Sequence, residues 1–126
     1  MKRIVFASAL LVFLIIFNCF CLDTITKIKN EATLKLDELY MLTANEDFEK
    51  TALECEKFTE YWLSEHHILS LIVRHDLLDQ TTFSVSRFVP LAKFEEKGEL
   101  ASEISRCKIL LDEIWDCERP LFRNIF

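Results

Sequence analysis

The sequence predicts an all-α protein in which an N-terminal transmembrane helix precedes a small bundle of about four amphipathic helices, arranged as two helical hairpins. One observation is composition: the 126 residues include one Gly and two Pro, whereas hairpin-rich β folds need such residues at their turns. A second observation is the spacing of the apolar residues. After position 23 they recur at three- and four-residue steps, as on one face of a helix.

The third observation is the apolar N-terminal stretch. Nineteen uncharged residues, Ile4–Leu22, lie between Arg3 and Asp23. As a helix they are about 28 Å long, close to the ~30 Å of a bilayer core. We therefore divide the chain into a signal anchor, residues 1–22, and a helical domain, residues 23–126. Lys2 and Arg3 favour an N-in orientation with the domain on the outer face of the membrane.

Cleavage of this segment as a signal peptide is the alternative. Cleavage requires only the apolar core Ile4–Phe17 and small residues before the cut. Cys19 and Cys21 have suitable size and spacing, but bulky or polar neighbours make the site poor. We favour a single-pass protein of the cell membrane, and a secreted domain is the alternative.

The first two bundle helices are predicted over residues 24–43 and from the break at 44–47 to about Val73. No Gly or Pro separates the first helix from the membrane segment, so the two are expected to be continuous. Asn45 is the expected N-cap of the second helix. The predicted buried stripes are Ile25, Ile28, Ala32, Leu36, Leu39 and Thr43, then Phe48, Ala52, Cys55, Phe58, Trp62, Leu69 and Ile72.

The third helix is expected to be irregular. Asp76 or His75 is its predicted N-cap. Pro90 cannot donate a hydrogen bond to the Ser86 carbonyl and should kink or split the helix. Gly98 stands where the residue after a helix C-cap is expected. The predicted apolar positions are Leu78, Val85, Phe88, Val89 and Ala92.

The fourth helix is predicted over residues 99–118, because Pro120 prevents its continuation. Its stripe is Leu100, Ile104, Cys107, Leu111 and Ile114. The apolar tail Leu121–Phe126 is expected to pack against the domain or the membrane surface.

Charge and motifs exclude several function classes. Residues 23–126 hold all 21 acids and 13 of the 15 bases, a net charge of −8, and no basic cluster suits a nucleic acid. The sequence has no Gly-rich phosphate loop, nucleophile elbow or dinucleotide fingerprint. We expect no catalytic residues, no cofactor and no enzymatic activity.

His66, His67 and His75 are weak candidates for a metal site. Two ligands from one helix should be three or four residues apart. His66 and His67 are adjacent and point about 100° apart. We interpret the three as surface or capping residues.

The cysteines after the anchor form no Cys-x-x-Cys pair. We interpret Cys55, Cys107 and Cys117 as small buried hydrophobes, with a Cys55–Cys107 disulfide as the alternative. Cys107 and Cys117 lie about 15 Å apart along one helix, too far for a bridge. Trp62 lies on its apolar stripe, while Trp115 lies at the edge of its own.

Five segments carry a family resemblance: Trp62, Leu69–Asp76, Ser84–Arg87, Leu110–Ile114 and Arg123–Phe126. Together with the apolar N-terminal segment, their order resembles domain-of-unknown-function family 4363. The resemblance covers nearly the whole chain, and Pro90 and the cysteines depart from the family pattern. It implies a small bacterial protein with one membrane segment and a helical domain, and it supplies no activity. It marks His75, read as a helix-junction residue, and Asn124, read as a residue that docks the tail.

These observations predict a non-enzymatic interaction or accessory protein. It would be held at the membrane to bind another membrane protein or to associate with itself. The alternative is a secreted or tethered module that binds a small ligand or a metal between its helices.

Overall fold

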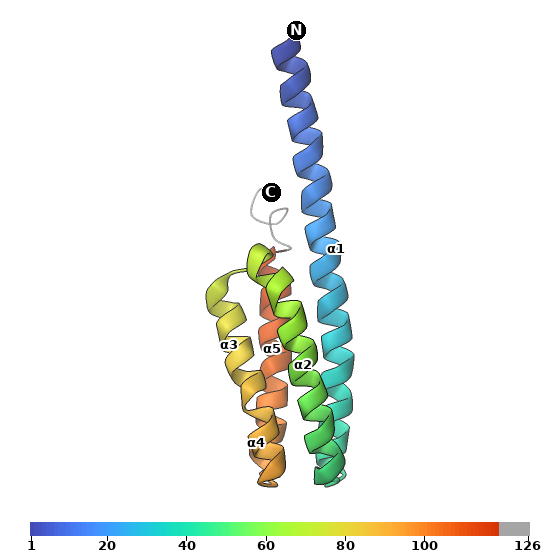
Figure 1. The fold of residues 1–126 in the computed structure, drawn as a ribbon, viewed down its shortest axis with the longest axis vertical. Coiled ribbons are helices and arrows are strands. Elements are labelled where there is room, and N and C mark those ends of the chain that lie inside the picture. The colour runs from blue at the N-terminus through green and yellow to red at the C-terminus, as the bar shows by residue number, and fades with distance from the viewer. Residues whose placement is uncertain (119–126) are drawn as a thin grey trace.

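The computed structural model describes residues 1–118 and contains only helices in this range (Figure 1). The all-α prediction is confirmed. The helices are α1 (Lys2–Ala44), α2 (Phe48–Ile72), α3 (His75–Ser86), α4 (Phe88–Lys93) and α5 (Lys97–Glu118). The predicted tail and its landmark Asn124 lie outside the described residues.

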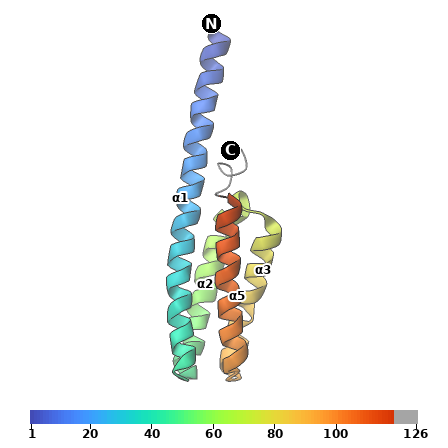
Figure 2. The same ribbon diagram turned by 180° about the vertical axis from the view of Figure 1, so that it is seen from behind.

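The bundle consists of four antiparallel columns, in which α3 and α4 together form the third (Figures 1 and 2). The C-terminal half of α1 packs against α2 and α5, and the α3–α4 column packs against the same two helices. This is an up-down bundle built from two hairpins, as predicted. The N-terminal part of α1 extends beyond it (Figure 1).

Helix α1 continues without a break from the apolar segment into the bundle. Residues 1–20 are exposed, Cys21 and Leu22 are half-buried, and full burial begins at Ile25. The buried positions of α1 are the six predicted for residues 24–43. Among the described helices, α1 alone is long and apolar enough to cross a bilayer, with a mean hydropathy of 2.7 over its most apolar window. A signal sequence meets the same criterion.

The turn between α1 and α2 differs from the prediction. Asn45 is the C-cap of α1, and its N–H donates to the Met41 and Thr43 carbonyls. The N-cap of α2 is Asp47, whose carboxylate accepts from the Lys50 N–H at 3.4 Å. The reason is Glu46, which adopts a left-handed φ of 60° and reverses the chain before the new helix begins.

The third column is split, as Pro90 predicts. The break lies at Arg87, three residues before the proline. This places Pro90 in the first turn of α4, where a helix needs no N–H donor.

The predicted caps of the third helix were wrong. Its N-cap is Arg74, which makes no side-chain capping bond, and His75 is the first residue of α3. Asp76 lies in the first turn and accepts from the Arg74 guanidinium at 2.9 Å. A negative side chain in the first turn interacts favourably with the positive end of the helix dipole, but it does not cap the helix.

Gly98 was also assigned wrongly, because it is the second residue of α5. The helix before it ends at Lys93, and Glu95 takes the left-handed position with φ 58°. The Glu96 N–H donates to the Leu91 carbonyl at 2.9 Å, and the Glu95 N–H donates to Ala92 at 3.2 Å. This pair of bonds is a Schellman motif with glutamate in the place usually held by glycine.

Replacing Glu95 with glycine should therefore stabilise the protein by about 0.5–1 kcal/mol, since glycine adopts positive φ without a steric cost. Thermal unfolding followed by circular dichroism would show a higher Tm. The matched control is Glu96→Gly, whose φ is not positive and which should show no gain. Equal Tm values for the two variants would contradict the motif.

The core joins all five helices around Trp62. This side chain is fully buried, and its Nε1 donates to the Thr82 hydroxyl at 2.9 Å. The Phe58 and Phe88 rings pack with centroids 5.8 Å apart. The prediction that Trp62 belongs to the core is confirmed.

Candidate interaction surface and buried polar cluster

A groove of about 670 Å³ lies between α1 and α2, in the half of the bundle far from the N-terminus. Two of its apolar side chains face solvent: Leu34 is 66% exposed and Met41 is 60% exposed. The lining residues are Leu34, Lys35, Asp37, Glu38, Leu39, Met41, Leu42, Asn45, Lys50, Glu54, Lys57 and Phe58.

The exposure of Leu34 and Met41 follows from helix geometry. The two residues are seven apart and so share one face of α1. Leu36 lies two residues after Leu34, about 200° around the helix, and it is fully buried. Leu34 and Met41 therefore face away from the core. Leu34 and Met41 were not predicted as surface residues. Two apolar residues seven positions apart and outside the buried stripe could have indicated an exposed apolar face.

The charges around the groove are balanced. Its lining contains three lysines and three acids, whereas the whole chain carries a net charge of −6. Lys57 pairs with Glu54 at 3.2 Å, and the Lys35 ammonium lies 4.8 Å from the centre of the Tyr61 ring. An approaching surface meets an apolar centre with a rim of both signs.

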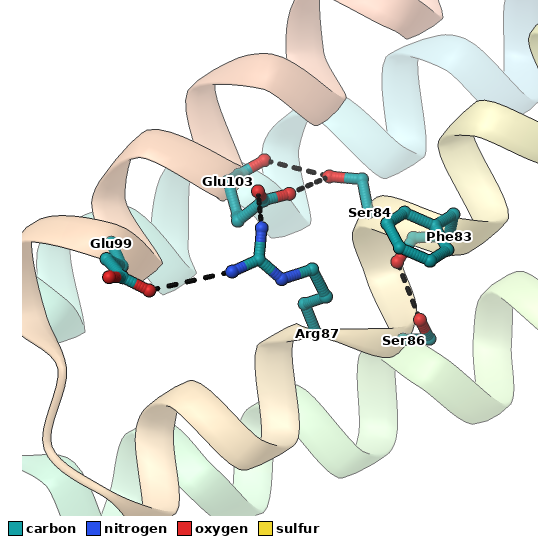
Figure 3. A network of polar contacts seen from close by, with 6 residues as sticks. All are labelled: Phe83, Ser84, Ser86, Arg87, Glu99 and Glu103. Atoms are coloured by element: carbon teal, nitrogen blue, oxygen red, sulfur yellow. Dashed lines mark hydrogen bonds and ion pairs between the residues drawn. The ribbon is translucent and has the colours of Figure 1, made fainter.

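A buried polar cluster joins the α3–α4 break to α5 (Figure 3). Its centre is Glu103, which is 7% exposed. The Ser84 hydroxyl lies 2.8 Å from the Glu103 Oε2 atom and 3.2 Å from its carbonyl. The Arg87 guanidinium pairs with Glu103 and with Glu99, the latter at 3.5 Å. Arg87 is the residue at which the column breaks, so the break aims its side chain at α5.

This cluster is suited to fixing structure. A serine beside a carboxylate is a familiar catalytic pairing, but Ser84 is 0% exposed, so no substrate reaches its hydroxyl. Within residues 1–118, every buried side-chain nitrogen and oxygen has a hydrogen-bond partner. A buried charge pair of this kind can set the register of two helices. Sequence reasoning did not single out Glu103, because its partners are 16 and 19 residues away.

The three histidines are not gathered around a common point. His66 is half-buried on α2, while His67 and His75 are exposed. Within residues 1–118, no group of three or more His, Cys, Asp or Glu side chains is placed to hold a metal ion.

All five cysteines are free thiols, so the alternative of a Cys55–Cys107 disulfide is wrong. The two residues lie on α2 and α5, which pack mainly against α1 and the α3–α4 column. Both are fully buried, and burial raises the pKa of each thiol to about 12. Cys117, predicted to be buried, is exposed because it lies in the last turn of α5, at the end of the bundle.

Alkylation should therefore separate the cysteines into two groups. In the folded full-length protein at pH 8, a water-soluble maleimide should fail to modify Cys55 and Cys107, because a buried, protonated thiol is a poor nucleophile. Cys117 should react readily. Peptide mass spectrometry would locate the label, and denatured protein, in which both buried thiols should react, is the control. Rapid labelling of Cys107 in the native state would contradict the packing of α5.

A family model described as a domain of unknown function, DUF4363, matches residues 19–125. The chain belongs to this family. The match spans the DUF4363 bundle and begins in the apolar part of α1, and it confirms the resemblance seen in the sequence. No curated protein and no solved structure matches the chain significantly.

The residues that carry the resemblance in the sequence have distinct places in this DUF4363 fold. Trp62 occupies the core, and Ser84 and Arg87 hold Glu103. His75 lies at the α2–α3 junction, as expected. Asn124 lies outside the described residues, so its expected role stays a prediction.

Proposed function

We propose that this DUF4363 protein is a membrane-tethered, non-enzymatic interaction protein that associates with a second copy of itself through the α1–α2 groove. Its N-terminal segment would lie in the cell membrane, with the bundle on the outer face. The observation that carries the proposal is the groove with exposed Leu34 and Met41 on the same unbroken helix that supplies the apolar segment.

Continuity of α1 supports a second copy as the partner. Two chains anchored by the same segment stand parallel in one membrane. A two-fold axis along the membrane normal then brings the same face of each bundle together, as in most homodimers.

The composition of the groove supports the same partner. The lining has three lysines and three acids and so no net charge, and two of the acids are already paired within the chain, Glu54 with Lys57 and Asp37 with Lys108. Two copies can therefore bring this face together without the repulsion expected of the acidic remainder of the surface. An apolar centre with a polar rim is the usual anatomy of a protein interface.

The test is chemical crosslinking of the full-length protein in its native membrane, followed by intact mass measurement. The wild type should yield a crosslinked dimer. Leu34→Glu combined with Met41→Glu places charge in the centre of the contact and should abolish the dimer. Phe94→Glu is the matched control, because Phe94 is 79% exposed and does not line the groove.

Three outcomes separate the possibilities. Loss of the dimer only in the groove variant supports the proposal. A different membrane protein crosslinked to the wild type, and lost in the same variant, would retain an interaction function and reject self-association. A wild type that is always alone, or that lacks its N-terminal segment, would contradict the tethered role.

The groove volume favours a second candidate function. Small-molecule sites span about 300–1,000 Å³, and this groove falls in that range. The candidate is a secreted or tethered module for a small, largely apolar ligand. Native mass spectrometry of the purified protein tests it, since a stoichiometric bound compound would support a ligand module. The histidines do not line the groove, so a metal is not part of this candidate.

A further inference from the structure

We propose that the end of the bundle from which α1 departs rests directly on the bilayer, and that Leu71, in the last turn of α2, inserts between phospholipid headgroups. This inference rests on the proposed function, because it requires the N-terminal segment of α1 to lie in the membrane. The ligand is a lipid surface rather than a protein.

The position of Leu71 follows from the antiparallel register of α1 and α2. The Tyr61 hydroxyl donates to the Glu31 carboxylate at 3.3 Å, which places these residues at one level. Ten residues further along α2 is Leu71, and ten residues back along α1 is Cys21. Both steps rise about 15 Å. Leu71 is therefore level with Cys21, at the end of the uncharged stretch that closes at Leu22.

No linker separates the bundle from the apolar segment. Helix α1 is unbroken from Lys2 to Ala44. Its side chains are exposed up to Phe20, and Cys21 and Leu22 are half-buried. Packing against the bundle thus begins where the apolar segment ends. If that segment spans the hydrocarbon core, the adjoining end of the bundle lies at the depth of the headgroups.

The side chains at this end suit a lipid interface. Leu71 is 88% exposed, more than any other large apolar side chain of residues 23–118, and Ile68 is 46% exposed one turn earlier. The nearby Arg74 and Asp76 neutralise each other. A leucine this exposed is unfavourable in water, and insertion between headgroups removes its apolar surface from water.

Helix α5 brings an aromatic residue to the same end. The Trp115 Nε1 atom donates to the Thr26 hydroxyl at 2.9 Å, and the Lys29 ammonium lies 4.6 Å from the ring centre. Thr26 lies four residues after the end of the uncharged stretch, about 6 Å along the helix. The indole therefore lies near the proposed headgroup level, on the side of the bundle. Tryptophan is enriched in this zone of membrane proteins. Asp23 and Asp116 are also exposed here and would be repelled by anionic lipid, so a zwitterionic lipid is the suitable probe.

The experiment measures the depth of position 71 in full-length protein reconstituted into phosphatidylcholine vesicles. Cys19 and Cys21 are changed to alanine and Cys117 to serine, while buried Cys55 and Cys107 are kept. Leu71→Cys then receives an environment-sensitive fluorophore. Phe94→Cys is the matched control, because Phe94 is 79% exposed and is the C-cap of α4, which ends at the far end of the bundle (Figure 1). Flotation on a density gradient verifies membrane insertion, and circular dichroism verifies the fold.

The expected result is a blue-shifted emission at position 71 that is quenched by lipids carrying a nitroxide near the headgroup, with neither effect at position 94. Protein that floats with the vesicles but has a water-like emission at position 71 overturns the inference and leaves the tethered role intact. Quenching at both positions also overturns it, because the bundle would then lie on its side. Protein that fails to float overturns the inference and the proposed function together.

Discussion

Replacing Trp62 with alanine should lower the free energy of unfolding by about 3–5 kcal/mol, the largest effect of any single substitution considered. Trp62 is fully buried and belongs to the core cluster that all five helices share, so the substitution takes the largest fully buried side chain out of the core and leaves a cavity. It also leaves the Thr82 hydroxyl without the indole N–H that donates to it. Domains of this size are stable by about 5–15 kcal/mol, so the variant should lose a large share of its stability.

Denaturant unfolding followed by far-ultraviolet circular dichroism measures this effect. Trp62→Phe should fall between the wild type and the alanine variant, because it keeps one aromatic ring in the core but loses the second ring of the indole and its N–H donor. The matched control is Leu63→Ala, since Leu63 is the next residue and is 51% exposed. Surface changes of this kind usually stay within about 0.5 kcal/mol. Similar losses for Trp62→Ala and Leu63→Ala would contradict the core described above.

Replacing Arg87 with alanine should destabilise the protein by about 1–3 kcal/mol. The substitution leaves the Glu103 carboxylate buried with Ser84 as its remaining side-chain partner. Removing one member of a fully buried ion pair costs about 3–5 kcal/mol. The expected value is smaller here because the Arg87 side chain is 41% exposed and water can enter where it stood.

A second substitution separates this explanation from simple loss of packing. Arg87→Ala combined with Glu103→Leu removes both charges and should recover most of the lost stability, because an apolar pair often replaces a buried ion pair without cost. Arg74→Ala is the matched control. It breaks an ion pair with Asp76 in which both side chains are more than half exposed, and such pairs contribute about 0–1 kcal/mol. A double variant less stable than Arg87→Ala would contradict the explanation.

The buried cysteines show what an apolar stripe along a helix predicts and what it does not. The 3.6-residue period correctly assigned Cys55 and Cys107 to buried faces of their helices. It contains no information on which helices become neighbours, and α2 and α5 pack mainly against other columns. Whether two buried cysteines meet depends on this order of packing, so the disulfide alternative was beyond reach of the sequence.

The turns show a second limit. Asn45 and Asp47 are both good capping residues, and local preference does not choose between them. In the folded chain, Glu46 pairs with Lys97 at 3.0 Å, 51 residues away, and its left-handed φ determines where α2 begins. Gly98 was misassigned for a similar reason, because the Schellman bonds that end α4 are made around Glu95.

By itself the sequence determined the helical class, the apolar N-terminal segment, the interruption near Pro90 and most of the buried stripe of each helix. Four predicted stripe residues are only half-buried: Phe48, Ala52, Ile72 and Val89. The features that the sequence determined depend on residues within a few turns of one another, where helix geometry alone relates position to face. The tertiary structure decided the α1–α2 groove, the pairing of Glu103 with Ser84 and Arg87, and the level of Leu71 relative to the apolar segment. Each of these joins residues on different helices, and their meeting depends on the order and register in which the helices pack.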